Sequence, residues 1–340
     1  MGRVLNVAIV GATGAVGETM LMVLQERNFP VHELHLLASE HSVGKTMNFN
    51  DRELQVENLA DFDFSGVDIV LFSAGGSVSK QYAPLAVQAG CVVIDNTSCF
   101  RYDDDIPLIV PEVNAHCLYQ YEKRGIIANP NCSTIQLVIA LKPIHDEVGI
   151  NRINVATYQA VSGTGKKAIS ELIHQLSELL NGKSVTPSVY PQQIAFNVLP
   201  HIDEFQENGY TREEMKMVWE TKKILEDDLI QVNPTTVRVP VLYGHSEAVN
   251  LELKAPLSAH EARELLRHAP GVKVLDDPAK LLYPTPFTHA VGHDEVFVGR
   301  IRDDISDPCG LNLWIVADNI RKGAATNAVQ IAEILQRDYL

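Results

Sequence analysis

Apolar residues in the first 130 positions come in short unbroken runs that alternate with segments of helical spacing. Four runs have the length of buried strands: VLNVAIV (4–10), HELHLLAS (32–39), VDIVLFSAGG (67–76) and CVVIDNTS (91–98). Two segments between them carry apolar residues three or four positions apart: ETMLMVLQERN (18–28) and SKQYAPLAVQAG (79–90). Apolar strands that alternate with helices indicate a parallel sheet. The first part of the chain is therefore predicted to be an α/β, Rossmann-like, doubly wound domain.

The pattern changes at about residue 151. Two longer segments have helical spacing: 166–182 and 210–227. Two segments between and after them alternate like strands: 235–242 and 248–255. This mixture predicts an α+β second domain. The last segment, 319–340, has the pattern of an amphipathic helix that returns to the first domain. A chain of 340 residues suits two domains, which we place at 1–130 with 319–340 and at 131–318.

The composition excludes several classes of protein. A formal net charge of −15 argues against a general nucleic-acid binder. No apolar run reaches the length of a membrane span, and the N-terminal residues lack the pattern of a signal peptide. The five cysteines show no zinc-like pairing and indicate a reducing compartment, with neither a disulfide framework nor a metal site. We expect a cytoplasmic protein without nucleic-acid or membrane partners.

A glycine-rich stretch, GATGAVG (11–17), follows the first predicted strand and opens the first predicted helix. Glycines at 11, 14 and 17 let the backbone turn tightly and approach a pyrophosphate, which then lies at the positive end of the helix. A plain strand-to-helix turn is the alternative. Because strand, loop and helix follow in the required order, we interpret the stretch as a dinucleotide-binding loop.

The end of the second predicted strand bears on which dinucleotide is bound. NAD enzymes place an acidic side chain there for the ribose hydroxyls. Here the stretch ASEHSVGK (38–45) offers Ser39, His41, Ser42 and Lys45 beside Glu40. Hydroxyls and a lysine suit a 2′-phosphate and favour NADP. Glu40 and the lack of an arginine leave NAD open.

Cys132 lies between Pro130 and the apolar run IQLVIAL, a position expected at the start of a helix. A helix N-terminus favours the thiolate form. A thiolate that attacks an aldehyde or an acyl phosphate gives a hemithioacetal or a thioester, both suited to hydride exchange with a nicotinamide. A free cysteine is also commonly a small buried apolar residue, and position alone leaves both interpretations open.

Later segments supply candidate partners for the cysteine. A second glycine loop, Ser162-Gly163-Thr164-Gly165, enters a predicted helix and could hold the nicotinamide end. Arg238 lies within the predicted strand at 235–242, and His245 lies just after its end. The alternative is that both are ordinary surface residues.

An ordered set of motifs makes the chain resemble the aspartate-β-semialdehyde dehydrogenase family from end to end. The motifs are VAIVGATGAVG (7–17), SAGG (73–76), DNTSCFR (95–101), VPEVN (110–114), NPNCST (129–134), YQAVSGTGKKA (158–168), FNVLPHID (196–203), WETKKI (219–224), RVPVLYGHSEA (238–248) and DNIRKGAA (318–325).

This resemblance implies NADPH-dependent conversion of β-aspartyl phosphate to aspartate semialdehyde and phosphate, in the biosynthesis of lysine, threonine, methionine and isoleucine. Cys132 would form the thioester, His245 would be the general acid and base, and Gln159 would orient the substrate. A histidine suits that role because its pKa lies near neutrality. The resemblance also implies a homodimer built through the second domain.

The resemblance assigns the remaining site residues to substrate and cofactor. Arg238 would grip the substrate carboxylate and Glu220 its ammonium group. The phosphate would meet Arg101, Lys223, Asn131 and Ser98. The cofactor would meet Gly11, Thr13, Gly14, Ala15, Val16, Ser39, His41, Ser42, Ser162, Gly163 and Asn319. Many relatives carry an arginine in place of His41 and an alanine in place of Thr164, so dual use of NADP and NAD stays open.

Three alternatives were weighed against this interpretation. An N-acetyl-glutamyl-phosphate reductase shares the fold and the chemistry, but its cysteine follows Pro-Gly and it binds no free ammonium, so Asn131 and Glu220 disfavour it. A non-catalytic nucleotide-binding paralogue is disfavoured by the joint presence of Cys132, Gln159, Arg238 and His245. A glyceraldehyde-phosphate type of dehydrogenase is expected to carry a different cysteine motif.

Overall fold

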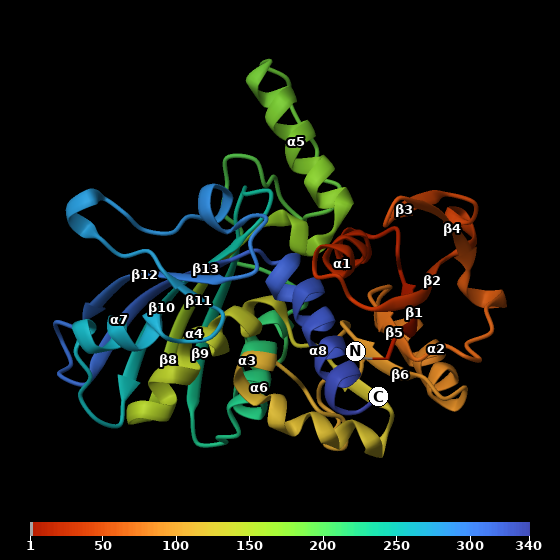
Figure 1. The fold of residues 1–340 in the computed structure, drawn as a ribbon. Coiled ribbons are helices and arrows are strands. Elements are labelled where there is room, and N and C mark those ends of the chain that lie inside the picture. The colour runs from red at the N-terminus through yellow and green to blue at the C-terminus, as the bar shows by residue number, and fades with distance from the viewer. Residues whose placement is uncertain (1–2) are drawn as a thin grey trace. The chain divides into compact units, whose positions relative to one another are not determined.

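A computed structural model describes residues 3–340, which form two compact units (Figure 1). The first unit contains the chain up to Asn131 together with Ala324–Leu340, and the second contains Cys132–Gly323. Among residues 3–340, no helix combines the length and the apolar character that crossing a bilayer requires.

The first unit is built on a seven-stranded sheet in the order β3-β4-β2-β1-β5-β6-β7. The strands are β1 Leu5–Val10, β2 Val31–Ala38, β3 Thr46–Phe49, β4 Arg52–Asn58, β5 Ile69–Phe72, β6 Val92–Asp95 and β7 Ile126–Ala128. All neighbours pair in parallel except β3 and β4. The predicted doubly wound α/β domain is therefore confirmed. The antiparallel hairpin at its edge was not predicted, because β3 and β4 alternate only weakly in hydrophobicity.

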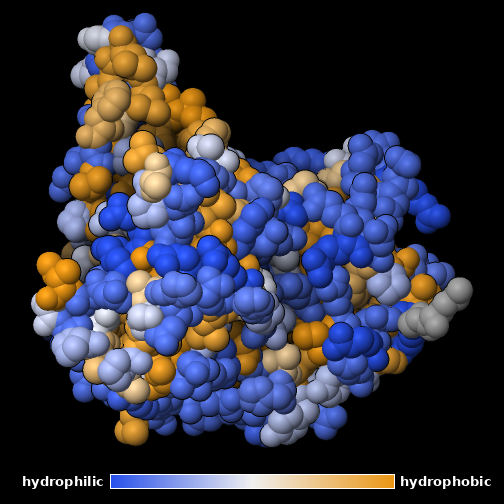
Figure 2. Space-filling view, turned by 60° about the vertical axis from the view of Figure 1, so that its left-hand side comes forward, coloured by the Kyte–Doolittle hydropathy of each residue, from blue (hydrophilic) through white to orange (hydrophobic). Residues whose placement is uncertain are grey.

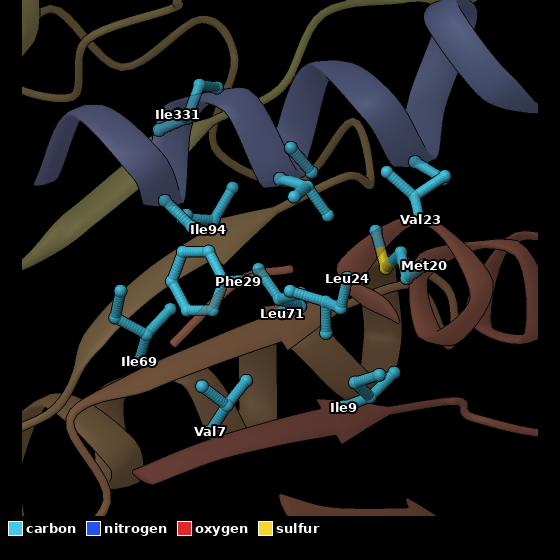
Figure 3. Packing of buried hydrophobic residues seen from close by; sticks show 14 of the residues in the cluster. Val7, Ile9, Met20, Val23, Leu24, Phe29, Ile69, Leu71, Ile94 and Ile331 are labelled. Carbon is cyan, nitrogen blue, oxygen red and sulfur yellow. The ribbon is translucent and has the colours of Figure 1, made fainter. Parts of the chain in front are cut away.

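Helices cover both faces of this sheet, as the apolar strands require. They are α1 Ala15–Glu26, α2 Gly76–Gln88, the short α3 Pro111–Asn114 and α8 Thr326–Asp338. Figure 3 shows Ile331 of α8 with Met20, Val23 and Leu24 of α1 over strands that carry Ile9, Leu71 and Ile94. Each such aliphatic side chain stabilises the fold by about 1.5–3 kcal/mol when fully buried. The C-terminal helix thus belongs to the core of the first unit.

The second unit is built on a six-stranded mixed sheet in the order β11-β12-β13-β10-β8-β9. Its strands are β8 Ile150–Gln159, β9 Gln231–Arg238, β10 His245–Leu253, β11 Val272–Val274, β12 Val296–Asp303 and β13 Gly310–Ala317. Its helices are α4 Cys132–Val148, α5 Lys166–Leu180, α6 Arg212–Leu225 and α7 Ala259–Arg267. Helices α4, α6 and α7 pack on the sheet, whereas α5 extends away from it (Figure 1).

Short 3₁₀ and π segments connect these elements. Five are 3₁₀ turns: Glu40–Ser42, Leu59–Asp61, Ala115–Lys123, Val161–Thr164 and Pro278–Lys280. Two are π turns: Pro286–Ala290 and Arg321–Ala325.

The sheet of the second unit buries one face and leaves the other partly open. Along β8 from Ile153 and along β10 from Glu247, every second residue is buried. Tyr158 and Trp314 lie on the open face with ring centroids 5.6 Å apart. The projecting helix α5 also carries exposed apolar side chains, including Ile173 and Leu180 (Figure 2).

Two predicted boundaries in the second half of the chain were wrong. The strand expected at 235–242 ends at Arg238, because Pro240 cannot donate to a strand ladder. His245 is the first residue of β10, so Arg238 and His245 flank a loop rather than one strand. The helix expected over 319–340 begins only at Thr326, after the π turn.

Candidate active site

The glycine loop of the first unit leads from β1 into α1 with a geometry that requires glycine. Gly11 has a φ of +88°, and the Gly14 N–H donates to the Gly11 carbonyl oxygen at 3.0 Å. A Cβ on Gly17 would lie only 2.2 Å from that oxygen. The turn therefore presents the backbone N–H groups at the start of α1, where the helix dipole favours a phosphate. The predicted residues of this loop are Gly11, Thr13, Gly14, Ala15 and Val16.

A cavity of about 500 Å³ opens beside this loop. Its wall comes from the glycine loop, the end of β2 and the start of α2, and it includes Thr13, Ser39, Glu40 and Tyr82. The volume and the mixed polar and apolar lining suit the adenosine end of a dinucleotide. Ser39 and Glu40 both line the wall, so features typical of NADP sites and of NAD sites stand side by side.

Ser42 connects the glycine loop to the predicted 2′-phosphate residues. The Thr13 and Ser42 hydroxyl oxygens lie 3.3 Å apart, and Lys45 Nζ lies 3.5 Å from the Ser42 hydroxyl oxygen. His41 is exposed on the same 3₁₀ turn. The first unit thus gathers Thr13, Ser42 and Lys45 at one edge of the dinucleotide cavity.

Three of the predicted phosphate residues belong to the first unit: Ser98, Arg101 and Asn131. The loop after β6 that carries Ser98 and Arg101 is anchored by Asp95, whose carboxylate accepts from Ser79 Oγ at 2.8 Å and from Thr97 Oγ1 at 2.8 Å. Burial raises the pKa of Asp95. Arg101 is buried and donates to the Asn96 carbonyl oxygen at 2.9 Å. Their joint phosphate site with Lys223 stays a prediction.

Cys132 is the first residue of α4 in the second unit, as the sequence predicts. Its side chain is half-buried. A Cβ placed on Gly323 would lie 2.9 Å from Cys132 Cβ, so glycine at 323 leaves room for the cysteine. The rest of α4 is almost continuously buried from Ser133 to Leu141. This packing fixes the cysteine at the positive end of a rigid helix.

Cys132 and His245 lie at the same end of the second unit. Helix α4 ends at Val148 and β8 begins at Ile150, so the two run in opposite directions. Because β10 is antiparallel to β8, it runs with α4. Gln136, one turn after Cys132, faces Glu247, two residues after His245. One helical turn and two strand residues advance by about the same 6 Å.

Three predicted site residues lie side by side across three strands. Arg238 of β9 pairs with Gln159 of β8 in the sheet register. Tyr158 pairs with Ser246 of β10, so Gln159 is level with His245. All three side chains are at least 95% buried. Residues distant in sequence therefore form one row, Arg238-Gln159-His245, at the end of the sheet.

His245 is fully buried, and its two ring nitrogens have different surroundings. The Ala160 backbone N–H donates to Nδ1 at 3.0 Å, while Nε2 has no hydrogen-bond partner among the described residues. Because Nδ1 accepts, the neutral ring carries its proton on Nε2. Burial, helped by the Arg238 charge, lowers the pKa of His245 to about 3, and Glu213 opposes this shift.

Arg238 is held from two sides. One guanidinium nitrogen donates to the Ala160 carbonyl oxygen at 2.7 Å, and the guanidinium carbon lies 6.0 Å from the centroid of the Tyr190 ring. Its Nε is buried without a hydrogen-bond partner among residues 3–340. A Cβ on Gly163 would lie 3.1 Å from the guanidinium and 3.5 Å from His245 Nε2. Gly163 therefore leaves space directly beside both groups.

Asn319 joins the second glycine loop to the residue before His245. Its amide pairs with the Ser162 hydroxyl at 3.0 Å, and its Oδ1 accepts from the Gly244 N–H at 2.9 Å. The structure thus brings together Ser162, Gly163 and Asn319, all predicted for the nicotinamide side.

Helix α6 supplies Glu220 and Lys223. Glu220 is fully buried and Lys223 is half-buried. Glu220 and Lys223 lie three positions apart on one helix, but the burial of Glu220 excludes an ordinary pair of surface residues. The role of Glu220 at a substrate ammonium group stays a prediction.

Two residues that the sequence did not single out hold Gln159. The Thr157 hydroxyl donates to Gln159 Oε1 at 3.0 Å, and Gln159 Nε2 donates to Glu213 Oε1 at 3.1 Å. Glu213 lies two residues into α6 next to Glu214, which belongs to an ordinary capping box. No sequence signal distinguishes Glu213 from any other acidic residue in a first helical turn.

Glu247 is a second buried acid that the sequence did not indicate. It is fully buried on β10, two residues after His245, and neither of its oxygens has a geometrically sound hydrogen bond among the described residues. Burial raises its pKa well above the usual value, against the effect of the nearby Gln136 amide. Burial therefore favours the neutral form of this acid, which lies two residues from the histidine on the same strand.

Two family models match the chain. The model described as "Semialdehyde dehydrogenase, NAD binding domain" matches residues 6–121. The model described as "Semialdehyde dehydrogenase, dimerisation domain" matches residues 141–322.

Individual relatives match over the full length. The aspartate-semialdehyde dehydrogenase of Legionella pneumophila is 73% identical over 340 residues, which are 100% of this chain and 98% of that protein. Aspartate semialdehyde dehydrogenase II of Vibrio cholerae complexed with ASA is 59% identical with a TM-score of 0.98, over 99% of this chain and 100% of that one. The Candida albicans enzyme with NADP is 26% identical with a TM-score of 0.76, over 98% and 99% of the two chains. The chain belongs to the aspartate-semialdehyde dehydrogenase family.

Proposed function

We propose that this chain interconverts β-aspartyl phosphate and aspartate semialdehyde, with NADPH and NADP as cofactor pair and a thioester on Cys132 as intermediate. The observation that carries the proposal is the row Arg238-Gln159-His245 at the end of the sheet where α4 presents Cys132. The row combines a carboxylate-binding group, an amide and a proton-transfer group beside a nucleophile.

Cys132 acts as the nucleophile. The N-terminus of α4 favours its thiolate through the helix dipole. The sulfur attacks the acyl carbon of β-aspartyl phosphate, an S–C bond forms, and the C–O bond to phosphate breaks with its electron pair leaving on phosphate. In the reverse direction, inorganic phosphate attacks the thioester and frees the sulfur.

His245 exchanges protons at Nε2, the nitrogen that has no hydrogen-bond partner within residues 3–340. To take the thiol proton there, the ring must carry its other proton on Nδ1. The Ala160 N–H, which donates to Nδ1 in the resting site, must then give way. The working state of the histidine therefore differs from the resting one by a shift of the ring or of the Ala160 peptide.

Charged side chains recognise the ends of the substrate. Arg238 binds the α-carboxylate, for which a planar guanidinium with free donors is suited. The buried Glu220 binds the α-ammonium group. The phosphate is bound by Arg101 and Lys223, with Asn131 and Ser98 as further donors. An acidic protein of net charge −15 thus concentrates cations where its anionic substrate binds.

The cofactor is held by both glycine loops. The cavity beside Gly11–Val16 takes the adenosine and pyrophosphate end, with Ser39, His41 and Ser42 near the 2′-phosphate. Ser162, Gly163 and Asn319 bind the nicotinamide side. When bound, the cofactor supplies or accepts a hydride at the acyl carbon held on Cys132.

The partner is a second copy of the chain, joined through the second unit. The open face of its sheet carries Tyr158 and Trp314, and α5 exposes Ile173 and Leu180. These apolar surfaces are expected to be covered in a dimer.

The test is phosphate-dependent reduction of NADP by aspartate semialdehyde. The purified protein should show this activity and should prefer aspartate semialdehyde to N-acetyl-glutamate semialdehyde. Cys132→Ser should abolish turnover while the dissociation constant for NADP stays within about twofold. Wild-type protein with a reduced, intact Cys132 and no such activity would show the proposal to be wrong.

Cofactor choice has its own test at position 41. NADP and NAD should be compared by kcat/KM in the wild type and in His41→Arg. A guanidinium added near Ser42 should raise the preference for NADP by about tenfold, the value of one charge-assisted hydrogen bond. If the ratio of kcat/KM for NADP to kcat/KM for NAD is unchanged in His41→Arg, position 41 does not lie at the 2′-phosphate site.

A further inference from the structure

Gln159 is fixed at both ends of its amide by groups of opposite hydrogen-bonding character. The Thr157 hydroxyl donates to Oε1 at 3.0 Å, and Nε2 donates to Glu213 at 3.1 Å. A carboxylate only accepts hydrogen bonds, so it binds the NH₂ side of an amide and rejects the oxygen side. The amide of Gln159 can therefore take one orientation.

We propose that Glu213 is a positioning residue of this site. Its carboxylate holds the Gln159 amide in the orientation that turns Nε2 toward α6. The second hydrogen on Nε2 can then donate to an acyl oxygen of the substrate. The inference rests on the proposed function and deepens it. In the locked orientation Gln159 offers a donor to the developing oxyanion at Cys132. A flipped amide would present its oxygen instead and repel that charge.

The surroundings of Glu213 are arranged to keep it charged although it is buried. Its side chain is 7% exposed and lies in the first turn of α6, where the helix dipole favours a carboxylate. Lys216 pairs with it at 3.0 Å and with Asp203 at 2.7 Å. Burial opposes protonation of Lys216, but the two carboxylates raise its pKa above the usual value. A buried charge needs such a partner.

Glu213 also acts on His245. Two charged groups influence the histidine: Arg238 lowers its pKa and Glu213 raises it. The same carboxylate that orients Gln159 thus makes the imidazolium form of its neighbour less unfavourable. Both effects reach the reacting atoms only through Gln159 and His245.

The lysine offers a matched control. Glu213→Gln and Asp203→Asn each remove one carboxylate from Lys216, but only the first touches Gln159. We expect Glu213→Gln to lower kcat by about tenfold or more, since small misplacements of a site group cost up to about 100-fold. KM for aspartate semialdehyde should change by less than about threefold, and Asp203→Asn should stay within about twofold of the wild type.

A double-mutant cycle tests whether Glu213 acts through Gln159. In the Gln159→Ala background, adding Glu213→Gln should lower kcat by a clearly smaller factor than in the wild type, because only its effect on His245 remains. Equal losses of kcat in Glu213→Gln and Asp203→Asn would overturn the proposal. So would losses of kcat in the cycle that simply add. If Glu213→Gln does not fold by circular dichroism, Glu213→Asp replaces it. That variant keeps the charge but withdraws from Gln159, and the same loss is expected.

A spectroscopic readout separates this proposal from the proposed function. In protein labelled with ¹⁵N-glutamine, the Gln159 side-chain NH₂ signal is identified by its loss in Gln159→Ala. It should shift in Glu213→Gln and stay in place in Asp203→Asn, whether or not the wild type turns over aspartate semialdehyde. If the Gln159 signal does not shift in Glu213→Gln, the Glu213 carboxylate does not hold the Gln159 amide.

Discussion

Two titratable side chains two residues apart on β10 are both held neutral by burial. Burial lowers the pKa of His245 to about 3 and raises that of Glu247. The opposite directions follow from one cause, because a dry environment disfavours the charged form of base and acid alike. The histidine is thereby kept as a neutral ring at physiological pH, able to exchange a proton with a thiol.

Glu247 should make the protein less stable as pH rises. Its unfolded-state pKa is near 4.5 and its folded-state pKa is higher, so above about pH 5 the folded state holds one proton more than the unfolded state. The free energy of unfolding then falls by about 1.4 kcal/mol per pH unit until the folded pKa is reached. Glu247→Gln should remove this dependence and should gain in stability relative to the wild type as pH rises above about 5.

Urea unfolding at several pH values measures this effect. Glu252→Gln, on the same strand but partly exposed, should retain the wild-type slope. A wild-type slope in Glu247→Gln would show that Glu247 is ionised in the folded protein.

The resting tautomer of His245 is a second prediction at this scale. Since the Ala160 N–H donates to Nδ1, ¹⁵N spectra of histidine-labelled protein at neutral pH should show Nε2 protonated and Nδ1 bare. The signal is assigned by its loss in His245→Gln. The opposite tautomer, or a doubly protonated ring, would contradict the described contact.

At the scale of elements, α4 and the π turn before α8 meet at the cysteine. Gly323 leaves space for Cys132, since a Cβ there would lie 2.9 Å from the cysteine Cβ. Strand β10 and helix α4 run together, so the nucleophile and the histidine are set by two rigid elements rather than by loops. Such elements hold catalytic groups more precisely than loops do.

Gly323→Ala should therefore impair catalysis more than stability. The added methyl must displace the start of α4, and a shift of about 1 Å costs up to about 100-fold in kcat. Steady-state kinetics and thermal unfolding should be measured together. A variant with wild-type kcat would show that the cysteine tolerates displacement. One that loses its fold would show that the contact is structural.

The sequence predicted those elements whose apolar pattern is strong and local. Strands β1, β2, β5 and β6, the helix that begins at Cys132 and the glycine turn before α5 were expected, whereas the three-residue β7 was not. The hairpin β3–β4 was missed because Thr46–Phe49 and Arg52–Asn58 are mostly polar. The end of β9 was misplaced because the apolar pattern continues past Arg238, although Pro240 breaks the ladder.

Site residues were predictable only where a family motif marks them. Gln159 and Arg238 become neighbours through the pairing of β8 with β9, which no local pattern encodes. Glu213 and Thr157 are recognised only by what they touch, since neither sits in a distinctive spacing. Glu247 lies within the motif RVPVLYGHSEA, yet its burial is a property of the packed helix α4.

For the whole molecule, the two units divide the work of cofactor and substrate binding. The dinucleotide cavity lies within the first unit, and Cys132 and His245, the proposed nucleophile and proton-transfer group, lie within the second. The second unit also carries an open sheet face and the dimerisation-domain match. Assembly and catalysis therefore depend on the same sheet.

Sedimentation equilibrium should give a mass of about twice the 37.5 kDa of one chain. Ala248 lies on the open face, opposite Ala156 of β8, and Ala248→Arg would place a charge in an apolar interface. That variant should sediment as a monomer, whereas Ile305→Arg, at a fully exposed turn, should remain a dimer. If the Ala248→Arg protein is still a dimer, the interface must lie on another surface of the chain.

The central claim is that Cys132 carries the acyl group. Mixing the protein with aspartate semialdehyde and NADP in phosphate-free buffer, then quenching in acid and mapping peptides by mass spectrometry, tests it directly. We predict an aspartyl adduct on the peptide that contains Cys132, lost on addition of phosphate and absent from Cys132→Ser. NADPH formation with Cys132 unmodified, or an adduct on another residue, would contradict the account.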